Sequence, residues 1–322
     1  MSLAPIALFV YNRPRHTEQT LLALSNNALA NESDLFIFCD GPKPNCTPKQ
    51  SADISAVLEV AKKKQWCKNV TLIQSEKNKG LANSIIAGVT DLLNKYGKVI
   101  VLEDDLVTSQ WFLKYMNEAL DYYWDRKSVF SIGGCRPPLD KMRIPDDYEY
   151  DVFVGLRSYS WGWATWKDRW GQVNWTMDYM DSFLKHPEQV KAFNRAGEDM
   201  TRLLKMQYDG RIDSWAMRFG FAHFYQHAVA ILPCISYVDN IGFDGSGTHC
   251  GNYSSVTYSK DILLAKENCL FLDVLYEDRR IINAFYSSFY PGRRPLWQRA
   301  CNFIARKLGK TPPFIIKKKI YY

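Results

Sequence analysis

Apolar runs alternate with segments of helical spacing over the first 135 residues of the chain. Short apolar runs predict five strands, at residues 6–11, 35–39, 70–74, 99–102 and 129–133. The segments between them place apolar residues on one helical face and predict helices over 16–28, 51–64, 81–96 and 111–124. Strands separated by helices of this length are typical of a mostly parallel sheet with crossover helices. The first part of the chain therefore predicts an α/β, Rossmann-like fold flanked by helices.

The pattern changes after residue 135. Residues 136–175 are rich in Pro, Tyr and Trp and follow neither a clean helical nor a clean strand period. Helical patterns return over 178–225, and residues 230–238 predict a late strand. A Gly-rich stretch at 241–253 follows, which is typical of a loop that closes over a ligand. The chain shows no internal repeat and no low-complexity linker, so residues 1–290 are expected to form one domain.

Composition limits the class of protein. With 322 residues and 47% hydrophobic composition, the chain can bury a sizeable core. It contains no run of 18 uninterrupted apolar residues, and its first residues lack the basic region and cleavage site of a signal peptide. Its eight cysteines include no CxxC pair. These features predict a cytoplasmic protein with reduced thiols.

The net charge of +7 is concentrated in a tail. Residues 291–322 contain nine Lys or Arg and no acid, which leaves the rest of the chain with a net charge of −2. Apolar residues recur at helical spacing in this tail, so it predicts a basic amphipathic helix that contacts an anionic membrane surface. The alternatives are a solvated tail and a helix packed on the body. The slightly acidic body, without a nucleic-acid-binding motif, argues against a nucleic acid partner.

The stretch VIVLEDDLV, residues 99–107, places three carboxylates directly after a buried strand. Burying adjacent carboxylates without partners costs several kcal/mol, so Glu103, Asp104 and Asp105 need a cation or a hydrogen-bonding ligand. Carboxylates at a strand end suit a hard divalent cation, Mn²⁺ or Mg²⁺, which also takes phosphate oxygens as ligands. The alternative is that Asp104 and Asp105 favour the start of the following helix near Ser109.

Other polar residues also come directly after predicted strands. They are Asn12 and Arg13 after the first strand, Asp40 after the second, and Lys79, within Asn78-Lys79-Gly80, after the third. Ligands of such sheets bind at the carboxyl ends of the strands. We therefore expect these residues and the acidic triplet to line one cleft.

These motifs resemble the nucleotide-binding half of GT-A glycosyltransferases. The likeness comprises FVYNRP, Asp40, NKGLANS and VLEDDLV in order, and it continues into Asp213-Ser214-Trp215 with Arg218. It is strongest to the branch that includes the animal β-1,2-N-acetylglucosaminyltransferase I and bacterial polysaccharide-locus sugar transferases. The resemblance implies a GT-A domain, with a nucleotide-sugar-binding half at 1–135 and an acceptor half at 136–290.

Carried over residue by residue, the resemblance implies a metal-dependent transferase that moves a sugar, GlcNAc among the candidates, from a UDP-sugar to a glycan hydroxyl. Arg13 would contact the diphosphate or sugar, and Asp40 the uracil. Glu103 would bind the transferred sugar, Asp104 the ribose, and Asp105 the metal. A lipid-linked acceptor would suit the membrane contact expected of the tail.

Asp213 is the residue that the resemblance assigns as general base, which implies inversion at the anomeric carbon. The chain departs from the family pattern here, because Ser214 replaces an acid and Ala216 is an extra residue before Met217. The alternative is that Asp213 caps the helix that follows it, since Asp is favoured at that position. Asp209 and Asp239 are the nearest rival bases.

Two further groups are candidates for binding. The Gly-rich loop supplies Gly245, Gly247 and Thr248 as substrate contacts, and the resemblance gives its His249 as a second metal ligand; the alternative for His249 is a polar or phosphate contact. Aromatic rings stack on sugars. We therefore expect one or two tryptophans of the cluster, Trp161 or Trp163, in the cleft wall, with Trp215 as a further wall.

Two rival functions remain. A sugar-nucleotidyltransferase shares the metal, the nucleotide and the parallel sheet, but the Gly-rich loop typical of that class is replaced here by Asn12-Arg13-Pro14. A non-catalytic nucleotide-sugar or glycan-binding protein on the same fold would bind ligand without turnover.

Overall fold

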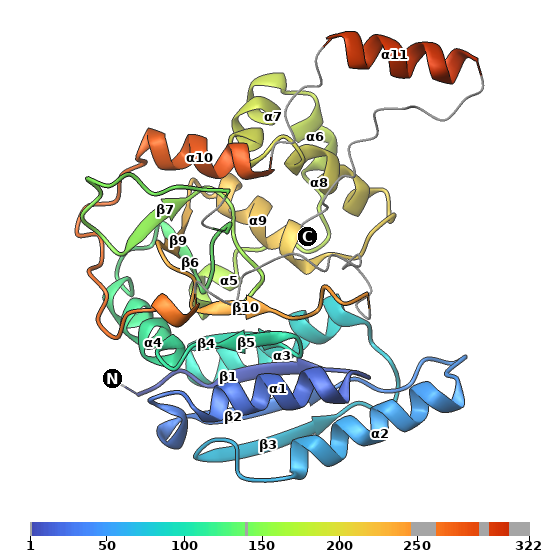
Figure 1. Ribbon diagram of the computed structural model, residues 1–322, viewed down its shortest axis with the longest axis vertical. Helices are drawn as coiled ribbons and strands as arrows, with labels where there is room; N and C mark the ends of the chain where they lie inside the picture. The colour runs from blue at the N-terminus through green and yellow to red at the C-terminus, as the bar shows by residue number, and fades with distance from the viewer. Residues whose placement is uncertain (1, 139–140, 246–261, 290–295, 309–322) are drawn as a thin grey trace.

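The structure is a computed structural model that describes residues 2–138, 141–245, 262–289 and 296–308. Its centre is an eight-stranded sheet in the order β3-β2-β1-β4-β8-β6-β9-β7 (Figure 1). The strands at one side of the sheet are β3 (Asn69–Gln74), β2 (Asp34–Cys39), β1 (Ile6–Val10) and β4 (Lys98–Glu103), all mutually parallel. The predicted α/β fold with a mostly parallel sheet is confirmed.

The other side of the sheet is mixed. Its strands are β8 (Trp163–Trp166), β6 (Val129–Gly133), β9 (Val229–Pro233) and β7 (Val152–Gly155). β8 runs antiparallel to both β4 and β6, β6 is parallel to β9, and β7 is antiparallel to β9. A separate antiparallel pair joins β5 (Leu106–Thr108) to β10 (Val238–Asn240). One continuous sheet thus contains strands from both halves of the chain.

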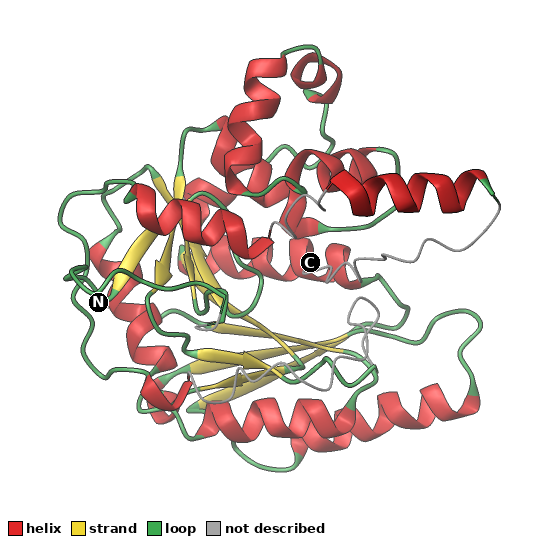
Figure 2. Cartoon of the chain, turned by 45° about the horizontal axis from the view of Figure 1, so that its top comes forward, coloured by secondary structure: helices red, strands yellow, loops and turns green. Residues whose placement is uncertain are grey.

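Helices cover both faces of the sheet, so the body has three layers (Figure 2). α1 (Pro14–Ser25), α2 (Pro48–Lys62) and α4 (Phe112–Tyr122) pack with Ile6, Leu8 and Val10 of β1 on one face. α3 (Leu81–Tyr96), α5 (Lys167–Trp170) and α9 (Trp215–Tyr225) pack with Ala7 and Phe9 on the other. This alternation follows from the period of two along a strand.

The remaining elements are all helical. They are η1 (Ala30–Glu32), α6 (Met180–Leu184), α7 (Pro187–Phe193), η2 (Asn194–Ala196), α8 (Met200–Tyr208), η3 (Ile262–Leu264), α10 (Arg279–Phe289) and α11 (Leu296–Lys307). α6 to α9 share an apolar cluster, and α10 packs on β7 and β9 through Ile281 and Phe285. Among the helices of the described residues, none combines the length and apolar character needed to cross a bilayer.

Local chemistry explains several element ends. Thr47 caps α2 through a capping box with Gln50. α3 ends at Gly97, whose φ of 79° is a left-handed conformation that glycine adopts without a Cβ penalty. The first helix begins at Pro14, two residues before the prediction, because proline is compatible with the first turn.

Two sequence predictions of strands are corrected. The predicted strand at 230–238 is two strands, β9 in the main sheet and β10 in the small one, with Cys234–Tyr237 between them. The tryptophan-rich segment, for which the sequence predicted no strand, contains β8. All four residues of β8 are buried, so the strand shows no alternation of polar and apolar positions.

Candidate active site

A cavity of about 500 Å³ lies at the carboxyl ends of β1, β2 and β4. This volume is within the range of small-molecule sites, roughly 300–1,000 Å³. Residues expected in the cleft from the sequence that do line it are Asn12, Arg13, Asp40, Glu103, Asp104, Asp105, Trp161, Asp213 and Trp215. Strand-end residues of the first half therefore face Asp213 and two aromatic residues of the second half across one cavity.

Glu103, Asp104 and Asp105 form one wall of the cavity, which we call the acidic wall, and Arg13 pairs with two of these residues. Its guanidinium makes a two-pronged contact with Asp104, in which Nε lies 3.3 Å from Oδ2 and Nη2 contacts Oδ1. Its Nη1 donates to Asp105 Oδ2 at 3.0 Å. Both aspartates are buried and lie in the turn between β4 and β5. The alternative that they favour a helix start is therefore wrong, because β5 and not a helix follows them.

Arg13 alone does not keep three neighbouring carboxyl groups fully ionised. Burial, with the neighbouring Asp105 and Asp104, raises the pKa of Glu103 to about 8. Burial also raises the pKa of Asp104, although the positive charge of Arg13 opposes that shift. One guanidinium therefore does not compensate three carboxylates, and a further cation at this wall would be favourable.

The first residues after β10 pack directly on Asp105. The Ile241 amide donates to the Asp105 carbonyl at 2.9 Å. A Cβ at Gly242 would lie 2.2 Å from Asp105 Oδ2, so only glycine fits this approach. His16 Nε2 lies 3.2 Å from Asp244 Oδ2, which ties the same segment to α1. The described start of the Gly-rich loop thus rests on the acidic wall.

Asp40 joins the loops that follow β2 and β3. Its Oδ1 accepts hydrogen bonds from the Gly41 and Lys79 amides, both at 2.9 Å. Its Oδ2 accepts from the Gly80 amide at 3.1 Å, at the start of α3. The carboxylate therefore fixes this wall while it still lines the cavity.

Asp213 lies on the opposite wall, before α9. Its side chain is 59% exposed, and Arg218 Nη2 lies 3.1 Å from its Oδ1. Ser214 caps α9, because its hydroxyl accepts from the Met217 amide at 3.3 Å. The alternative that Asp213 is the cap is therefore wrong. Its carboxylate is open to the cavity and is paired with Arg218.

The tryptophans divide between cavity and core. Trp161 and Trp215 line the cavity, and Trp161 also packs edge-on against Phe243. Trp163 is 1% exposed and stacks between Trp170 and Trp215, with a ring separation of 4.6 Å to Trp215. The prediction that Trp163 lines the cleft is wrong, because β8 directs it into the core beneath α9.

Several expected contacts take other positions. Lys79 is exposed and does not line the cavity, and it touches the site only through its backbone amide. Gly245 is described, with a left-handed φ of 87°, but it is not among the lining residues. Gly247, Thr248 and His249 lie outside the described residues.

The sequence reasoning missed part of the cavity lining: Phe9, Tyr11, Phe38, Lys43, Leu81, Ser84, Ser160, Ser214, Ala216 and Asn240 belong to it. Phe9 and Phe38 stack with ring centroids 4.8 Å apart. Lys43 follows the end of β2, so the rule that located Asp40 could have found it, whereas Asn240 is the last residue of β10 in the small antiparallel pair. The two serines and Ala216 carry no comparable signal.

The donor set of the cavity fits a divalent metal. Among the described residues that line it, five carboxylates, those of Asp40, Glu103, Asp104, Asp105 and Asp213, face two basic side chains, Arg13 and Lys43. Carboxylate oxygens suit Mg²⁺ or Mn²⁺. In the described part of the chain no group of three or more His, Cys, Asp or Glu side chains is arranged to hold a metal ion, so substrate or water oxygens would have to supply the remaining ligands.

Comparisons with known proteins give structural likeness only. No family model matches the chain, and no curated protein matches it. A mannosyltransferase from Pyrobaculum calidifontis, solved with GDP-Man and Mn²⁺, is 13% identical with a TM-score of 0.36 and covers 52% of this chain. Mouse xyloside xylosyltransferase 1 is 11% identical, with a TM-score of 0.35 over 70% of this chain. A UDP-glucose pyrophosphorylase with bound UDP-glucose is 10% identical, with a TM-score of 0.38 over 73% of this chain.

The chain spans 45% of that mannosyltransferase, 82% of the xylosyltransferase and 91% of the pyrophosphorylase. Both glycosyltransferases and an enzyme that makes nucleotide sugars are thus among the similar structures. Because the identities and TM-scores are this low, the likeness is not evidence about the reaction.

Proposed function

We propose that this chain is a metal-dependent glycosyltransferase that moves a sugar from a UDP-sugar to a glycan hydroxyl with inversion. The observation that supports the proposal most is that two different walls line one cavity. Arg13 and the acidic triplet form one wall, and Asp213 with Trp161 and Trp215 forms the other. A donor with a charged leaving group and an acceptor hydroxyl need these two kinds of wall.

The acidic wall would hold the donor. A diphosphate is anionic and would be repelled by the carboxylates alone, so Asp105 would hold a divalent metal that neutralises the leaving group when it is bound. Arg13 pairs with Asp104 and Asp105. In the donor complex the Arg13 guanidinium would gain phosphate oxygens as partners, since its planar donors suit phosphate as well as carboxylate.

The neighbouring carboxylates would orient the rest of the donor. Glu103 would accept hydrogen bonds from hydroxyls of the transferred sugar and Asp104 from those of the ribose. Asp40 would read the uracil. The backbone bonds of Asp40 fix the orientation of its carboxylate before a ligand binds.

Asp213 would act on the acceptor. As the acceptor oxygen attacks the anomeric carbon, Asp213 would take the hydroxyl proton while the bond to the nucleotide breaks on the opposite side of the sugar. Arg218 would orient Asp213 for this transfer. Trp161 and Trp215 would offer ring faces or edges to a sugar. The acceptor we propose is a glycan of a surface polysaccharide, with GlcNAc as the first sugar to test.

The test is a panel of nucleotide sugars with UDP, GDP, dTDP and CMP leaving groups. Purified protein is incubated with each donor and Mn²⁺ or Mg²⁺, and free nucleotide is measured by chromatography, since transferases hydrolyse their donors slowly without acceptor. We expect metal-dependent release of UDP from one UDP-sugar. Binding of a donor without release would instead support a non-catalytic binding protein.

A second reaction tests the remaining alternative, a sugar-nucleotidyltransferase. Sugar 1-phosphate and nucleoside triphosphate are supplied together, and pyrophosphate is measured. Production of pyrophosphate and nucleotide sugar would identify a nucleotidyltransferase and contradict the proposal, since transfer from a finished donor produces no pyrophosphate.

A further inference from the structure

Helix α11, Leu296–Lys307, exposes an apolar face that the proposed reaction does not use. Trp297, Phe303, Ile304 and the adjoining Leu308 are 57%, 62%, 55% and 65% exposed. At 100° per residue, Trp297, Ile304 and Leu308 fall within about 40° of one another, and Phe303 lies about 100° from Ile304, so the four side chains span about 140° of the helix surface. We call these four residues the α11 face.

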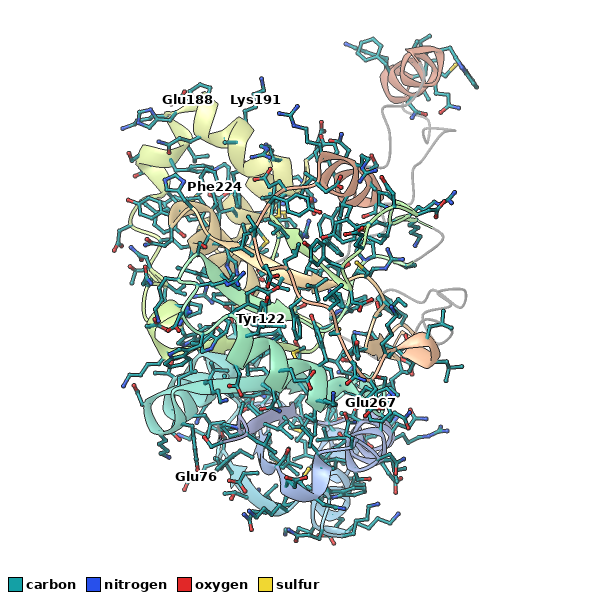
Figure 3. The ribbon with its side chains drawn as sticks, turned by 90° about the vertical axis from the view of Figure 1, so that its left-hand side faces the viewer. Glu76, Tyr122, Glu188, Lys191, Phe224 and Glu267 are labelled. Atoms are coloured by element: carbon teal, nitrogen blue, oxygen red, sulfur yellow. The ribbon has the colours of Figure 1, made fainter. Side chains whose placement is uncertain are left out.

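The α11 face is turned away from the covered side of the helix. Asn302, about 140° around the helix from Trp297, is only 3% exposed. Figures 1 and 3 both place α11 beside the body and not in one of its layers. The apolar side is therefore the open one, the reverse of a helix that packs into a globular core.

Charge around the α11 face indicates its partner. Residues 291–322 carry nine basic residues and no acid, whereas the rest of the chain has a net charge of −2. Lys307 Nζ lies 5.8 Å from the centre of the Phe303 ring, so a cation borders the apolar face. A helix with exposed Trp, Phe and Ile and a bordering cation, in a basic stretch of sequence, is suited to the interface of an anionic bilayer.

We propose that the α11 face docks on a membrane that contains anionic lipid. A second copy of the chain fits less well, because four side chains of one twelve-residue helix fall short of the roughly 800 Å² per partner that a stable interface buries. Tryptophan at position 297 also suits the headgroup region, where its ring and N–H have different surroundings. This inference does not depend on the proposed reaction.

The experiment is flotation of the full chain with vesicles of phosphatidylcholine alone or mixed with phosphatidylglycerol. We expect binding only to the mixed vesicles. Binding should fall strongly at about 1 M salt, where the screening length is about 3 Å. No binding to anionic vesicles at low salt would overturn the proposal, and so would equal binding to both kinds of vesicle.

Variants test whether the α11 face is the surface that binds. The double variant Ile304→Ser with Leu308→Ser should weaken binding at least tenfold, because two large apolar side chains no longer enter the interface. The matched control is Leu263→Ser with Val274→Ser, which removes two apolar side chains that are 81% and 73% exposed elsewhere. If both double variants bind equally, the α11 face is not the docking surface.

A charge pair completes the test. Lys307→Gln should weaken binding about fivefold, since a cation close to an anionic surface contributes about that factor. Lys49→Gln removes an exposed cation from α2 and should leave binding unchanged. Light scattering of each protein without lipid accompanies these measurements. A wild-type dimer that the α11 variant dissociates would assign the face to a second copy and overturn the proposal.

Discussion

Residues 1–135, which we propose bind the donor and call the donor half, carry the charged side chains of the site on the ends of parallel strands. Residues 136–290, which we propose bind the acceptor and call the acceptor half, present Asp213 and Trp161 from loops. Arg13 and Asp105 each lie within three residues of a buried strand end and pair with each other. Asp213 precedes α9, and the start of that helix rests on stacked tryptophans of β8 and α5. Ion pairs therefore position the side chains of one wall, and aromatic packing positions those of the other.

The first and largest expected effect comes from removing the proposed base, Asp213. Asp213→Asn should lower the turnover of donor by about 10²–10⁴-fold, since general base catalysis contributes that range. Its melting temperature and nucleotide affinity should stay unchanged, because the side chain is 59% exposed and pairs with Arg218 at the surface of the cavity. Steady-state kinetics and thermal melting measure both quantities.

The matched control for Asp213 is Asp209→Asn. Asp209 pairs with Lys205 at the end of α8 and does not line the cavity. Its turnover should equal that of the unmodified chain. If the Asp209 variant loses activity and the Asp213 variant keeps it, the base has been assigned to the wrong residue.

The aromatic support of the acceptor half is tested by Trp163→Ala. Removing this buried ring should lower the free energy of unfolding by about 3–5 kcal/mol, because it leaves a cavity between Trp170 and Trp215. Trp161→Ala, at the cavity wall, should instead mainly raise the KM for acceptor. Denaturant unfolding and kinetics of both variants separate the two roles, and equal loss of stability in both would contradict the division.

The sequence predicts the donor half better than the acceptor half for a physical reason. Parallel strands buried on both faces read as apolar runs, and the bounds of α3 and β6 match the prediction to the residue. The strand-end rule then locates Arg13, Asp40 and Asp105. In contrast, nothing in the local pattern distinguishes Trp163 from Trp161, because their difference depends on which side of β8 meets α9.

Long-range contacts account for the other omissions. β5 and β7 are three and four residues long, too short for a periodic signal, and each forms only by pairing with a strand distant in the chain. The contact of Gly242 with Asp105 also joins distant segments, so the Gly-rich loop is visible in the sequence while its anchor is not.

One titratable group in each half should make the free energy of unfolding depend on pH, and the two dependences should have opposite signs. In the acceptor half this group is His223. His223 is buried, with hydrogen bonds to Ser131 Oγ and the Phe219 carbonyl, and burial lowers its pKa to about 4. Between pH 6.5 and about 4 the unfolded chain takes up a proton that the folded chain does not. The free energy of unfolding should therefore fall as the pH falls through this window, by at most about 1.4 kcal/mol per pH unit.

Denaturant unfolding at several pH values checks this slope. His223→Gln should remove the contribution, while His186→Gln, an exposed histidine before α7, should retain it. An unchanged slope in the His223 variant would contradict the assignment.

Glu103, at the acidic wall, should produce the opposite effect in the donor half. Its pKa is raised to about 8, so between about pH 4.5 and 8 the folded chain holds a proton that the unfolded chain has lost. The free energy of unfolding should fall as the pH rises through this window. Glu103→Gln should remove that fall, and the same unfolding series, measured without metal, tests it. A steeper fall in the variant would contradict the account.

The most direct test of the central claim is thermal melting of the chain with UDP, GDP, CMP or dTDP, each with Mn²⁺, Mg²⁺ or EDTA, for the unmodified chain and Asp105→Asn. A ligand at about 100 times its dissociation constant adds about 2.7 kcal/mol of stability. The account predicts a rise in melting temperature with UDP that needs metal and is lost in the Asp105 variant. No rise with any nucleotide, or a rise with UDP that EDTA and the variant leave unchanged, would contradict a metal-dependent nucleotide site at this acidic wall.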